Sequence, residues 1–521
     1  MGAESLPLLS RRLIREARFQ DRPDLGVPGP GLFDLPVKVF QIGLGGYIRG
    51  HADVFLHDAI AAGAYGGRAA AIQPNSVEAP RKLAAQDNLY TVVSVGGTEA
   101  RPEFRYKIVG SLACAVAARE RWAEALSWAE GEIDLVTMVV TESGVRPDPA
   151  DRLDAAPPRS AMGKLTAFLH RRWQSRPNSC LAVLDSDNVA ENGEQVREAV
   201  LAMADAWGLG GRFRDWLRAS VTFPVTLGDR MVPGFPRDEA VLRRHWEALG
   251  YRDEGMVLAE PFSLWVVEDR FPGRRPALDA AGVKFVTDVR AYERMKIAIL
   301  NGAHTGLVHA AALMGVAYVR DAVRHPLLRP HAERLMFREV APYFEIAGED
   351  PTQYARDALA RFANPHLDHT TYQICTDGST KARHRLIPSL VRHVEKAGAT
   401  PPHLAFAVSA LLRYLTPAGR GEAQDAKGTL RRGVLGRRDD GTTYLIDDPR
   451  ADLLSGLPLG SGSDRTALDA VLGPILADAS LWGVNLRAAG GAAEAVQQYY
   501  AEMRAGGVEA ALRGVLGEGG D

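Results

Sequence analysis

A lysine, an asparagine and a histidine interrupt an otherwise apolar run in the second half of the chain. The run reads ERMKIAILNGAHTGLVHAAALMG and carries its polar side chains at Glu293, Lys296, Asn301 and His304. At about 100° per residue of an α-helix, these four side chains fall within one wedge of about 140°. The other directions carry Met, Ile, Ala and Leu, so the pattern predicts a buried helix with one polar stripe.

This polar stripe has the residue types needed for proton transfer. Burying a charged lysine costs free energy unless the lysine is paired or its pKa falls, and a lysine with a lowered pKa is a general base near neutral pH. Asn301 and His304 can donate hydrogen bonds to an oxygen on which negative charge develops. Glu293, one turn before Lys296, can exchange the lysine proton with water. On this pattern alone, a structural Lys–Glu pair in a domain interface is an equally good interpretation.

Strands and helices alternate along the chain before this helix. Apolar and β-branched runs that end in glycine or polar residues occur at 37–43, 68–75, 133–144, 179–188 and 219–230. Helical patterns lie between several of them, as in IRGHADVFLHDAIAAG and RWAEALSWAEGE. Such alternation predicts a mostly parallel sheet with helices on both faces, which binds ligands just past the carboxyl ends of its strands.

The amino-acid composition of the chain changes near residue 290. A chain of 521 residues is also too long for one hydrophobic core. The fold class expected is α/β, with an N-terminal Rossmann-like dinucleotide-binding domain over 35–290. A mostly α-helical domain for substrate binding and catalysis is expected over 291–521, because long Ala-, Leu- and Arg-rich stretches fill it. Residues 1–34 are expected to form an arm over the surface, and 419–442 a loop-rich insertion.

A glycine-rich turn follows the first strand in the segment FQIGLGGYIRG. Gly43 and Gly45 permit a tight turn and let backbone N–H groups approach a pyrophosphate at the start of the next helix. Ile48 stands where the third glycine of the GxGxxG pattern would fall. The strand–turn–helix context nevertheless favours dinucleotide binding over a plain turn.

The second strand ends in IQPNS, without the acidic residue that usually binds the adenine ribose. Gln73 and Asn75 offer amide groups for the ribose hydroxyls instead. Arg81 and Lys82 follow a few residues later and could accommodate a 2′-phosphate. The cofactor expected is NAD, with NADP left open.

Composition narrows the list of partners. Lys plus Arg total 62 against 64 for Asp plus Glu, so the charge balance gives no reason to expect a nucleic acid or a membrane partner. The start of the chain lacks the apolar stretch of a signal peptide, and three cysteines without a CxxC motif fit a reducing cytoplasm. The 13 histidines contain no HExxH motif, and the close pair His366 and His369 is weak evidence for a ligand set, so no metal is expected. We expect a cytoplasmic monomer that acts on a small molecule.

The Lys-x4-Asn-x2-His spacing of the lysine helix resembles the catalytic helix of the polyol-specific long-chain dehydrogenases, the mannitol dehydrogenase family. Further motifs resemble those of the family in the same order over most of the chain, namely FQIGLGGYIRGH, VVTESG, VLDSDNVAENG, FPVTLGDRMVP and TDGSTK. One departure is Gly228, which stands where a valine usually precedes Asp-Arg. Several ordered motifs are far more specific than any one of them.

The resemblance implies a role for each matched position. Lys296 is the general acid/base, Asn301 and Asn188 hold the substrate oxygen, His304 orients the substrate, and Glu293 gates proton release. No metal is needed, because lysine accepts the hydroxyl proton while hydride passes to a nicotinamide. The resemblance also implies substrate contacts at Asp229 and Lys381 and cofactor contacts at Gly46, Arg49, Thr141 and Glu142.

The substrate class depends on how a carboxylate would be held, ideally by an arginine fork. Thr370 follows His369 where fructuronate-type members tend to carry arginine, which favours a neutral sugar alcohol. Arg383 and Arg385 are nevertheless near enough to Lys381 to reach a carboxylate. The sequence therefore favours an NAD(P)-dependent polyol dehydrogenase, with a hexuronate reductase as the alternative. A 6-phosphogluconate-type dehydrogenase and a non-catalytic dinucleotide-binding protein fit less well.

Overall fold

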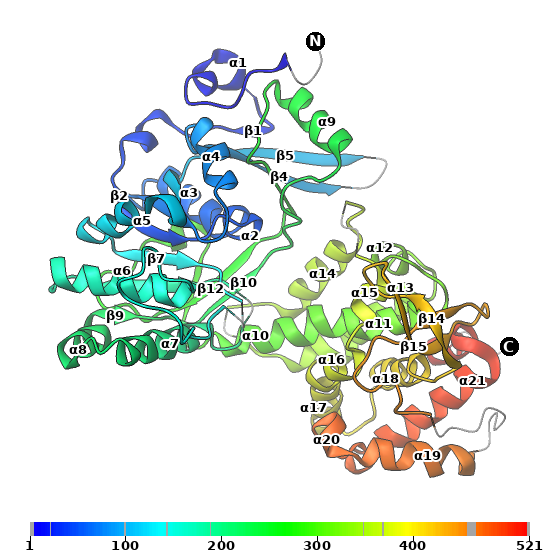
Figure 1. The fold of residues 1–521 in the computed structure, drawn as a ribbon. Helices are drawn as coiled ribbons and strands as arrows, with labels where there is room; N and C mark the ends of the chain where they lie inside the picture. The colour runs from blue at the N-terminus through cyan, green and yellow to red at the C-terminus, as the bar shows by residue number, and fades with distance from the viewer. Residues whose placement is uncertain are drawn as a thin grey trace. The chain divides into compact units, whose positions relative to one another are not determined.

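The computed structural model describes residues 5–20, 22–97, 101–141, 144–187, 189–346, 348–366, 369–455 and 465–517. The chain divides into two compact units, Met1–Val289 and Arg290–Asp521. In Figure 1 the first unit runs from blue to green and the second from green to red.

Unit 1 is built on a six-stranded sheet in which every neighbouring pair of strands is parallel. Counting β2 as its first strand, the spatial order β6-β3-β2-β7-β8-β9 becomes 3-2-1-4-5-6, the order of a Rossmann fold. The order reverses between β2 and β7, so the carboxyl ends of these strands border the crevice where such sheets bind ligands. The strands are β2 (Val37–Ile42), β3 (Arg68–Gln73), β6 (Leu112–Ala117), β7 (Leu135–Met138), β8 (Leu181–Asp185) and β9 (Val221–Thr222).

Both faces of this sheet are buried. Phe40 of β2 points to one face and stacks on Phe168, with ring centroids 3.8 Å apart, while its neighbour Val39 packs into the core of the other face. Burial on two sides explains why these strands read as continuous apolar runs in the sequence. The covering helices include α3 (Ala52–Ala61), α5 (Ala118–Ser127), α6 (Ala161–Ser175), α7 (Asn192–Ala206) and α8 (Gly211–Ser220).

The N-terminal segment is part of a core, so the prediction of a surface arm over 1–34 was wrong. Leu9, Leu13 and Phe19 are buried, and a short strand β1 (Leu25–Gly26) pairs with β5. In the sequence these apolar side chains are scattered among arginines. The segment is therefore polar on average, and no apolar run marks it as part of a core. This sheet has the order β1-β5-β4-β11, with β4 (Tyr90–Gly97), β5 (Pro102–Val109) and β11 (Val257–Ala259), and α9 (Glu239–Leu249) supplies side chains to the same core.

A third sheet of unit 1 joins β10, β12 and β13. The pair of β10 and β12 is antiparallel, and Asp229 at the end of β10 lies opposite Leu264. The strands are β10 (Thr226–Asp229), β12 (Leu264–Glu268) and β13 (Lys284–Val286).

Unit 2 is mostly helical around two buried helices, α11 (Gly302–Leu313) and α18 (Pro402–Tyr414). The expected loop-rich insertion over 419–442 instead forms most of an antiparallel sheet, which corrects that prediction. Its first two strands, Gly419–Gln424 and Leu430–Arg437, are largely exposed and pair through backbone hydrogen bonds, so they lack an apolar signal. Other elements of unit 2 are α10 (Arg290–Lys296), α14 (Pro351–Phe362), α16 (Gly378–Arg385), α20 (Ala479–Trp482), α21 (Ala492–Leu516), β14 (Gly419–Gln424), β15 (Leu430–Arg437) and β16 (Thr443–Leu445).

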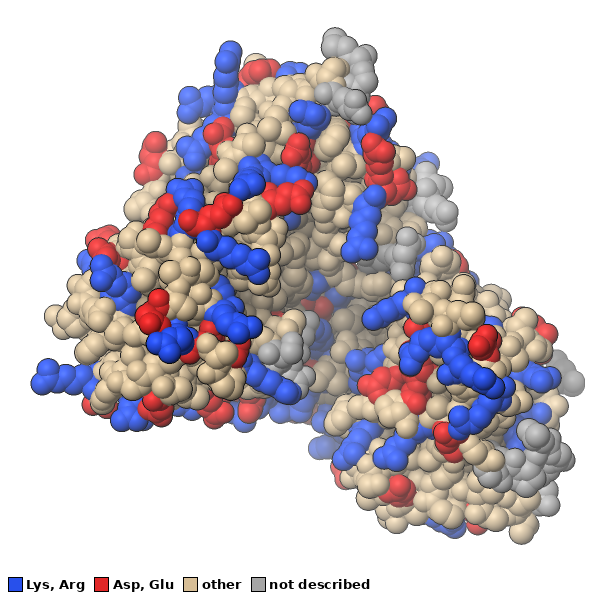
Figure 2. Space-filling view, in the orientation of Figure 1, with Lys and Arg blue, Asp and Glu red and all other residues tan. Residues whose placement is uncertain are grey.

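Charged side chains of both signs are interspersed on the face drawn in Figure 2, in keeping with the near-balance of 62 basic and 64 acidic residues. Within the described ranges, none of the helices combines the length and the apolar character needed to cross a membrane.

Candidate active site

The glycine turn lies at the carboxyl end of β2, where the strand order of the sheet reverses. Gly43 has a φ of +111°, in the region that favours glycine. A Cβ atom added at Gly43 or Gly45 would meet nothing within 4 Å, so the backbone of the turn is open to a ligand. An open backbone at the switch point of a parallel sheet fits the phosphates of a dinucleotide.

Two further glycines let the short helix α2 (Gly46–Gly50) pack closely against the segment that contains Val232 and Gly234. A Cβ atom at Gly46 would lie 2.9 Å from the Cα atom of Gly234, and one at Gly50 would lie 2.8 Å from a methyl group of Val232. These glycines allow the close packing that the third glycine of GxGxxG normally provides, while Ile48 is buried in the core. Gly46 therefore supports the turn by packing, and its contact with a cofactor stays a prediction.

Arg49 holds the turn from within the protein. Its Nε donates to the carbonyl of Leu44 at 2.9 Å, and its Nη1 donates to the carbonyl of Gly255. The guanidinium lies 5.1 Å from the centre of the Tyr90 ring, and burial lowers the pKa of Arg49. These contacts account for Arg49 without a cofactor, and the predicted cofactor contact stays untested.

The end of β3 is tied to the same turn. The N–H of Leu44 donates to Oε1 of Gln73 at 2.9 Å, so Gln73 fixes the turn, and its contact with a ribose stays a prediction. Asn75 is exposed two residues later. The two basic residues that follow are both in ion pairs, Arg81 with Glu120 at 2.6 Å and Lys82 with Glu78 at 2.7 Å.

Two of the predicted residues, Glu142 and Asn188, lie outside the described residues. Thr141 is exposed, and its carbonyl accepts hydrogen bonds from the N–H groups of Gly144 at 2.7 Å and Val145 at 3.1 Å. The segment that carries Thr141 therefore turns directly after β7, at the carboxyl edge of the sheet.

A buried amide braces the loop after β8. The Nδ2 of Asn192 donates to the carbonyls of Asp185 at 2.8 Å and Asp187 at 2.9 Å, and its Oδ1 accepts from the N–H of Thr226 at 3.0 Å. Asn192 is the asparagine of the Asn-Gly pair in VLDSDNVAENG. Its side chain thus joins the ends of β8 and β10.

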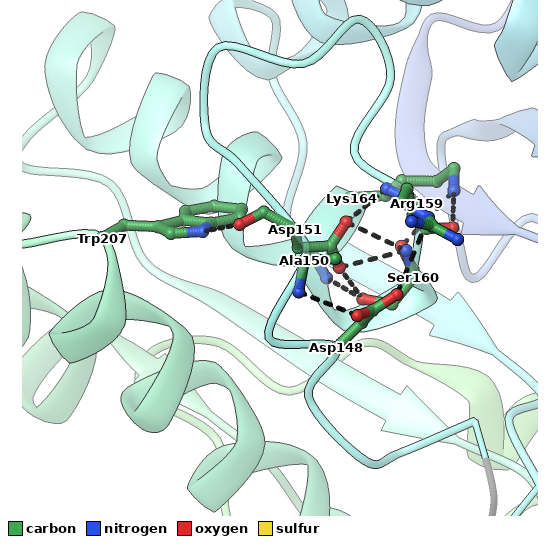
Figure 3. A network of polar contacts seen from close by, with 8 residues as sticks. Asp148, Ala150, Asp151, Arg159, Ser160, Lys164 and Trp207 are labelled. Carbon is green, nitrogen blue, oxygen red and sulfur yellow. Dashed lines mark hydrogen bonds and ion pairs between the residues drawn. The ribbon is translucent and has the colours of Figure 1, made fainter.

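The carboxylate of Asp151, in the long connection between β7 and α6, binds Ser160 immediately before α6 (Figure 3). Asp151 accepts hydrogen bonds from the N–H and hydroxyl groups of Ser160, and Ser160 caps α6 by accepting from the N–H of Gly163 at 2.8 Å. Lys164 donates to the carbonyl of Arg159 at 2.7 Å, and burial lowers the pKa of Lys164 to about 8. This buried lysine has a structural role.

Asp229 is buried at the end of β10, immediately after the departure from the family pattern at Gly228. A Cβ atom at Gly228 would collide with the hydroxyl of Tyr47 and lie 2.9 Å from Nε2 of His51. A valine therefore does not fit beside the Tyr47 side chain. Arg230, next in the motif, donates to the carbonyl of Gly50 at 2.6 Å and so joins this strand end to α2.

Lys296 is the last residue of α10 and is followed by a π-helical turn over Ile297–Asn301. A π turn bonds residue i to residue i+5, so Asn301 lies one turn along on the Lys296 face. The α-helical periodicity expected from the sequence separates these two side chains by about 140°, and that expectation was wrong. Lys296 is 8% exposed, as predicted for this helix, whereas Ile297 is 38% exposed.

His304 follows on α11 and is held by an aromatic ring. It stacks on Phe362 of α14, with centroids 3.9 Å apart and planes 22° apart. Burial lowers the pKa of His304 well below its ordinary value, and the nearby charges of four other side chains lower it further, so the ring is neutral near pH 7. Its buried Nε2 has no hydrogen-bond partner among the described residues. The four side chains are His369, Arg385, Arg361 and Lys381.

The predicted substrate residues on α16 separate onto two sides of that helix. Lys381 and Arg385 are four residues apart and share the side that faces His304. Arg383 points elsewhere, because its Nη1 donates to the carbonyl of Ser480 in α20 at 2.6 Å. The structure therefore does not bring Arg383 to the site. The helical step of about 100° per residue could have shown this, because two steps place Arg383 about 200° from Lys381.

Two contributors to this site were missed from the sequence. Phe362 and Arg361 come from α14, far from α11 in the chain, and nothing in their spacing pointed to His304. Glu293 is partly exposed one turn before Lys296, and its role in proton release stays a prediction. Among the described residues, no group of three His, Cys, Asp or Glu side chains is arranged to hold a metal ion.

Two protein-family models match consecutive parts of the chain. The model of the mannitol dehydrogenase Rossmann domain matches residues 37–280, and that of the mannitol dehydrogenase C-terminal domain matches residues 288–429. An altronate oxidoreductase of Bacillus subtilis (strain 168) is 33% identical over 387 residues, which cover 73% of this chain and 80% of that protein.

Two solved structures share the fold over nearly the whole chain. The mannitol 2-dehydrogenase of Pseudomonas fluorescens, in a ternary complex with NAD and D-mannitol, has a TM-score of 0.67 and 26% identity over 98% of this chain and 99% of that chain. A D-sorbitol dehydrogenase in substrate-free form has a TM-score of 0.78 and 22% identity over 97% and 100%. Because both domain models match in order and together span more than half of the residues, the chain belongs to the mannitol dehydrogenase family, as its motifs predicted.

Proposed function

We propose that this protein uses NAD to interconvert a secondary alcohol of a hexonate and the ketone of the corresponding hexuronate. The observation that carries the proposal is the buried Lys296 at the junction of an α-helix and a π turn, with Asn301 on the same face. A lysine so placed beside hydrogen-bond donors is the arrangement needed to take the proton of a hydroxyl group.

In the direction of oxidation, Nζ of Lys296 accepts the hydroxyl proton as the C–O bond gains double-bond character. When bound, NAD accepts the hydride that leaves the same carbon. The amide of Asn301 donates to the oxygen while it carries partial negative charge, and neutral His304 forms a further hydrogen bond through its Nε2. In the direction of reduction, protonated Lys296 returns the proton to the oxygen.

The cofactor is assigned from the turn and from a relative. Gly43 and Gly45 leave an open backbone for the phosphates, and the mannitol 2-dehydrogenase of Pseudomonas fluorescens was solved with NAD. Near the end of β3, Arg81 and Lys82 are each in an ion pair with a neighbouring glutamate, which reduces the positive charge available to a 2′-phosphate. The relative that was solved with NAD and the two ion pairs both support NAD over NADP.

The choice of a hexonate over a sugar alcohol reverses the order favoured by the sequence. The altronate oxidoreductase of Bacillus subtilis is more similar in sequence than the mannitol and sorbitol dehydrogenases, at 33% against 26% and 22% identity. The arginine missing at Thr370 is offset by cations that surround His304 from α14 and α16. A polyol dehydrogenase is the second candidate, supported by the D-mannitol bound in the Pseudomonas fluorescens enzyme.

The test is absorbance of reduced nicotinamide with the purified protein. NAD is offered with altronate and other hexonates, and in parallel with mannitol, arabinitol and sorbitol. The proposal expects the highest kcat/KM with a hexonate. Preference for a neutral polyol would favour the second candidate, and absence of turnover with every alcohol would overturn both.

A further inference from the structure

The side of α16 that faces His304 carries two cations one helical turn apart. Lys381 and Arg385 are both partly buried, and burial lowers the pKa of each. The two residues are four apart in α16 and so are neighbours on one side of that helix, and the charge of Arg385 lowers the pKa of Lys381 further. Together they form a cationic pair beside His304.

The positive charge of this pair is not neutralised by an ion pair with any described carboxylate. Arg385 donates from Nη1 to the hydroxyl of Thr305 at 3.3 Å, and Lys381 donates to the carbonyls of Ile374 at 2.9 Å and Thr376. These partners are all neutral. Asp377 raises the pKa of both cations from a distance, but it is not within ion-pair range. The guanidinium of Arg385 makes a single hydrogen bond with the described residues, so most of its N–H groups are left to bind an anion.

The cationic pair is connected to the residues assigned to catalysis. The hydroxyl of Thr305 receives the hydrogen bond from Arg385 and donates its own to the carbonyl of Asn301 at 3.0 Å. His304 precedes Thr305 in α11, and its buried Nε2 has no hydrogen-bond partner among the described residues. An anionic group on Arg385 therefore lies one side chain away from the π turn that carries Lys296 and Asn301.

We propose that Arg385 binds the carboxylate of the substrate in a two-point contact, with Lys381 adding positive charge, so that the enzyme selects sugar acids over sugar alcohols. This inference rests on the proposed function, because it assigns the far end of a substrate whose reacting carbon is served by Lys296. The guanidinium fork of arginine matches the two oxygens of a carboxylate, whereas the lysine contributes a point charge. In this chain Arg385 of α16 thus supplies the guanidinium that is missing at position 370, where a threonine stands.

The experiment compares Arg385→Gln with the wild-type protein on two substrates, altronate and the neutral hexitol of the same configuration. Glutamine keeps a donor for Thr305 but removes the charge. We expect kcat/KM for altronate to fall about a hundredfold or more, because a desolvated charge partner is lost, with hexitol turnover changed only a few-fold. Arg385→Lys should recover part of the altronate activity.

Arg383→Gln is the matched control, because Arg383 lies on the same helix and contacts Ser480 on another side. It should leave both substrates within a few-fold of wild type. Equal losses on altronate and hexitol in Arg385→Gln, or an altronate-specific loss in Arg383→Gln, would overturn the assignment.

A binding measurement separates this inference from the proposed function. Calorimetry with altronate and NADH should show a dissociation constant raised about a hundredfold in Arg385→Gln. Unchanged altronate binding in that variant would contradict the inference even if turnover changed. If wild-type protein bound altronate through Arg385 but turned over no alcohol with NAD, the proposed function would fail and the carboxylate site would stand.

Discussion

Two buried lysines differ in their surroundings, and only Lys296 is proposed to act in catalysis. Lys164 is 2% exposed, and its ammonium group donates to the carbonyls of Arg159 and Ser160, which stabilises the start of α6. Lys296 is 8% exposed at a π turn that also presents Asn301, with His304 close behind. Only the second lysine has neighbours able to hold a reacting oxygen.

Asn301→Ala tests the role of the amide at this scale. The amide acts on charge that develops during the reaction, so its loss should reduce kcat by about a hundredfold and change KM only a few-fold. Steady-state kinetics with the preferred substrate give both values. A rise in KM at unchanged kcat would instead assign Asn301 to ground-state binding.

Asp185 gives a prediction about pH. It is buried at the end of β8, where burial raises its pKa to about 7, although the N–H groups of Val140 and Asp187 donate to it. The folded state therefore holds this proton more tightly than the unfolded state. The resulting stabilisation is present below pH 4 and is lost as the pH rises towards 7, at up to about 1.4 kcal/mol per pH unit.

Asp185→Asn removes this titration and keeps an acceptor for Val140. Wild type loses this stabilisation as the pH rises and the variant does not. The free energy of unfolding of the variant minus that of wild type should therefore increase from pH 4.5 to pH 8. Urea unfolding at the two pH values measures it, with the exposed Asp215→Asn as control for the change in charge. The same difference from wild type at both pH values would show that Asp185 does not titrate there.

At the scale of elements, the π turn brings the site together. Hydrogen bonding from i to i+5 inserts one residue into the helix and aligns Lys296 with Asn301. The sequence could not reveal this, because the segment reads equally well as a continuous α-helix and the extra residue depends on packing against the rest of unit 2. Ile297, at the start of the turn, is 38% exposed and contributes little to the core.

Deleting Ile297 should convert the π turn to an α-helix. In that α-helix Lys296 and Asn301 would be four residues apart, about 40° from each other, so they would stay on one face and turnover should remain within a few-fold of wild type. Circular dichroism and thermal unfolding check the fold, and nicotinamide absorbance checks turnover. Ile297→Ala keeps the register and should stay within a few-fold of wild type. A folded deletion variant whose turnover falls about a hundredfold or more would show that the π turn itself is needed.

At the scale of the whole molecule, the glycine turn proposed to bind the cofactor belongs to unit 1, and Lys296, the proposed general base, belongs to unit 2. The Rossmann sheet could be predicted because its strands are buried on both faces and read as apolar runs, as in Val37–Ile42 and Leu181–Asp185. The N-terminal core segment and the sheet of β14, β15 and β16 could not, because scattered apolar residues and exposed strands leave no run.

The candidate site was predictable where its residues share one helix. Lys296, Asn301 and His304 lie within nine residues of each other and interrupt an apolar run, so the sequence singled them out. Arg361 and Phe362 reach His304 from another helix, and only the folded chain brings them together. Family motifs singled out residues that helical periodicity cannot identify, such as Asp229, which is buried at the end of β10.

The most direct test of the account is NAD-linked oxidation of altronate by wild type, Lys296→Ala and Lys164→Met, followed by nicotinamide absorbance. Because Lys296 is the assigned base, we expect turnover by wild type and a loss of about a hundredfold or more in Lys296→Ala, with its thermal unfolding unchanged. Lys164→Met should lower stability and keep turnover within a few-fold. Turnover in a folded Lys296→Ala protein close to that of wild type would contradict the account.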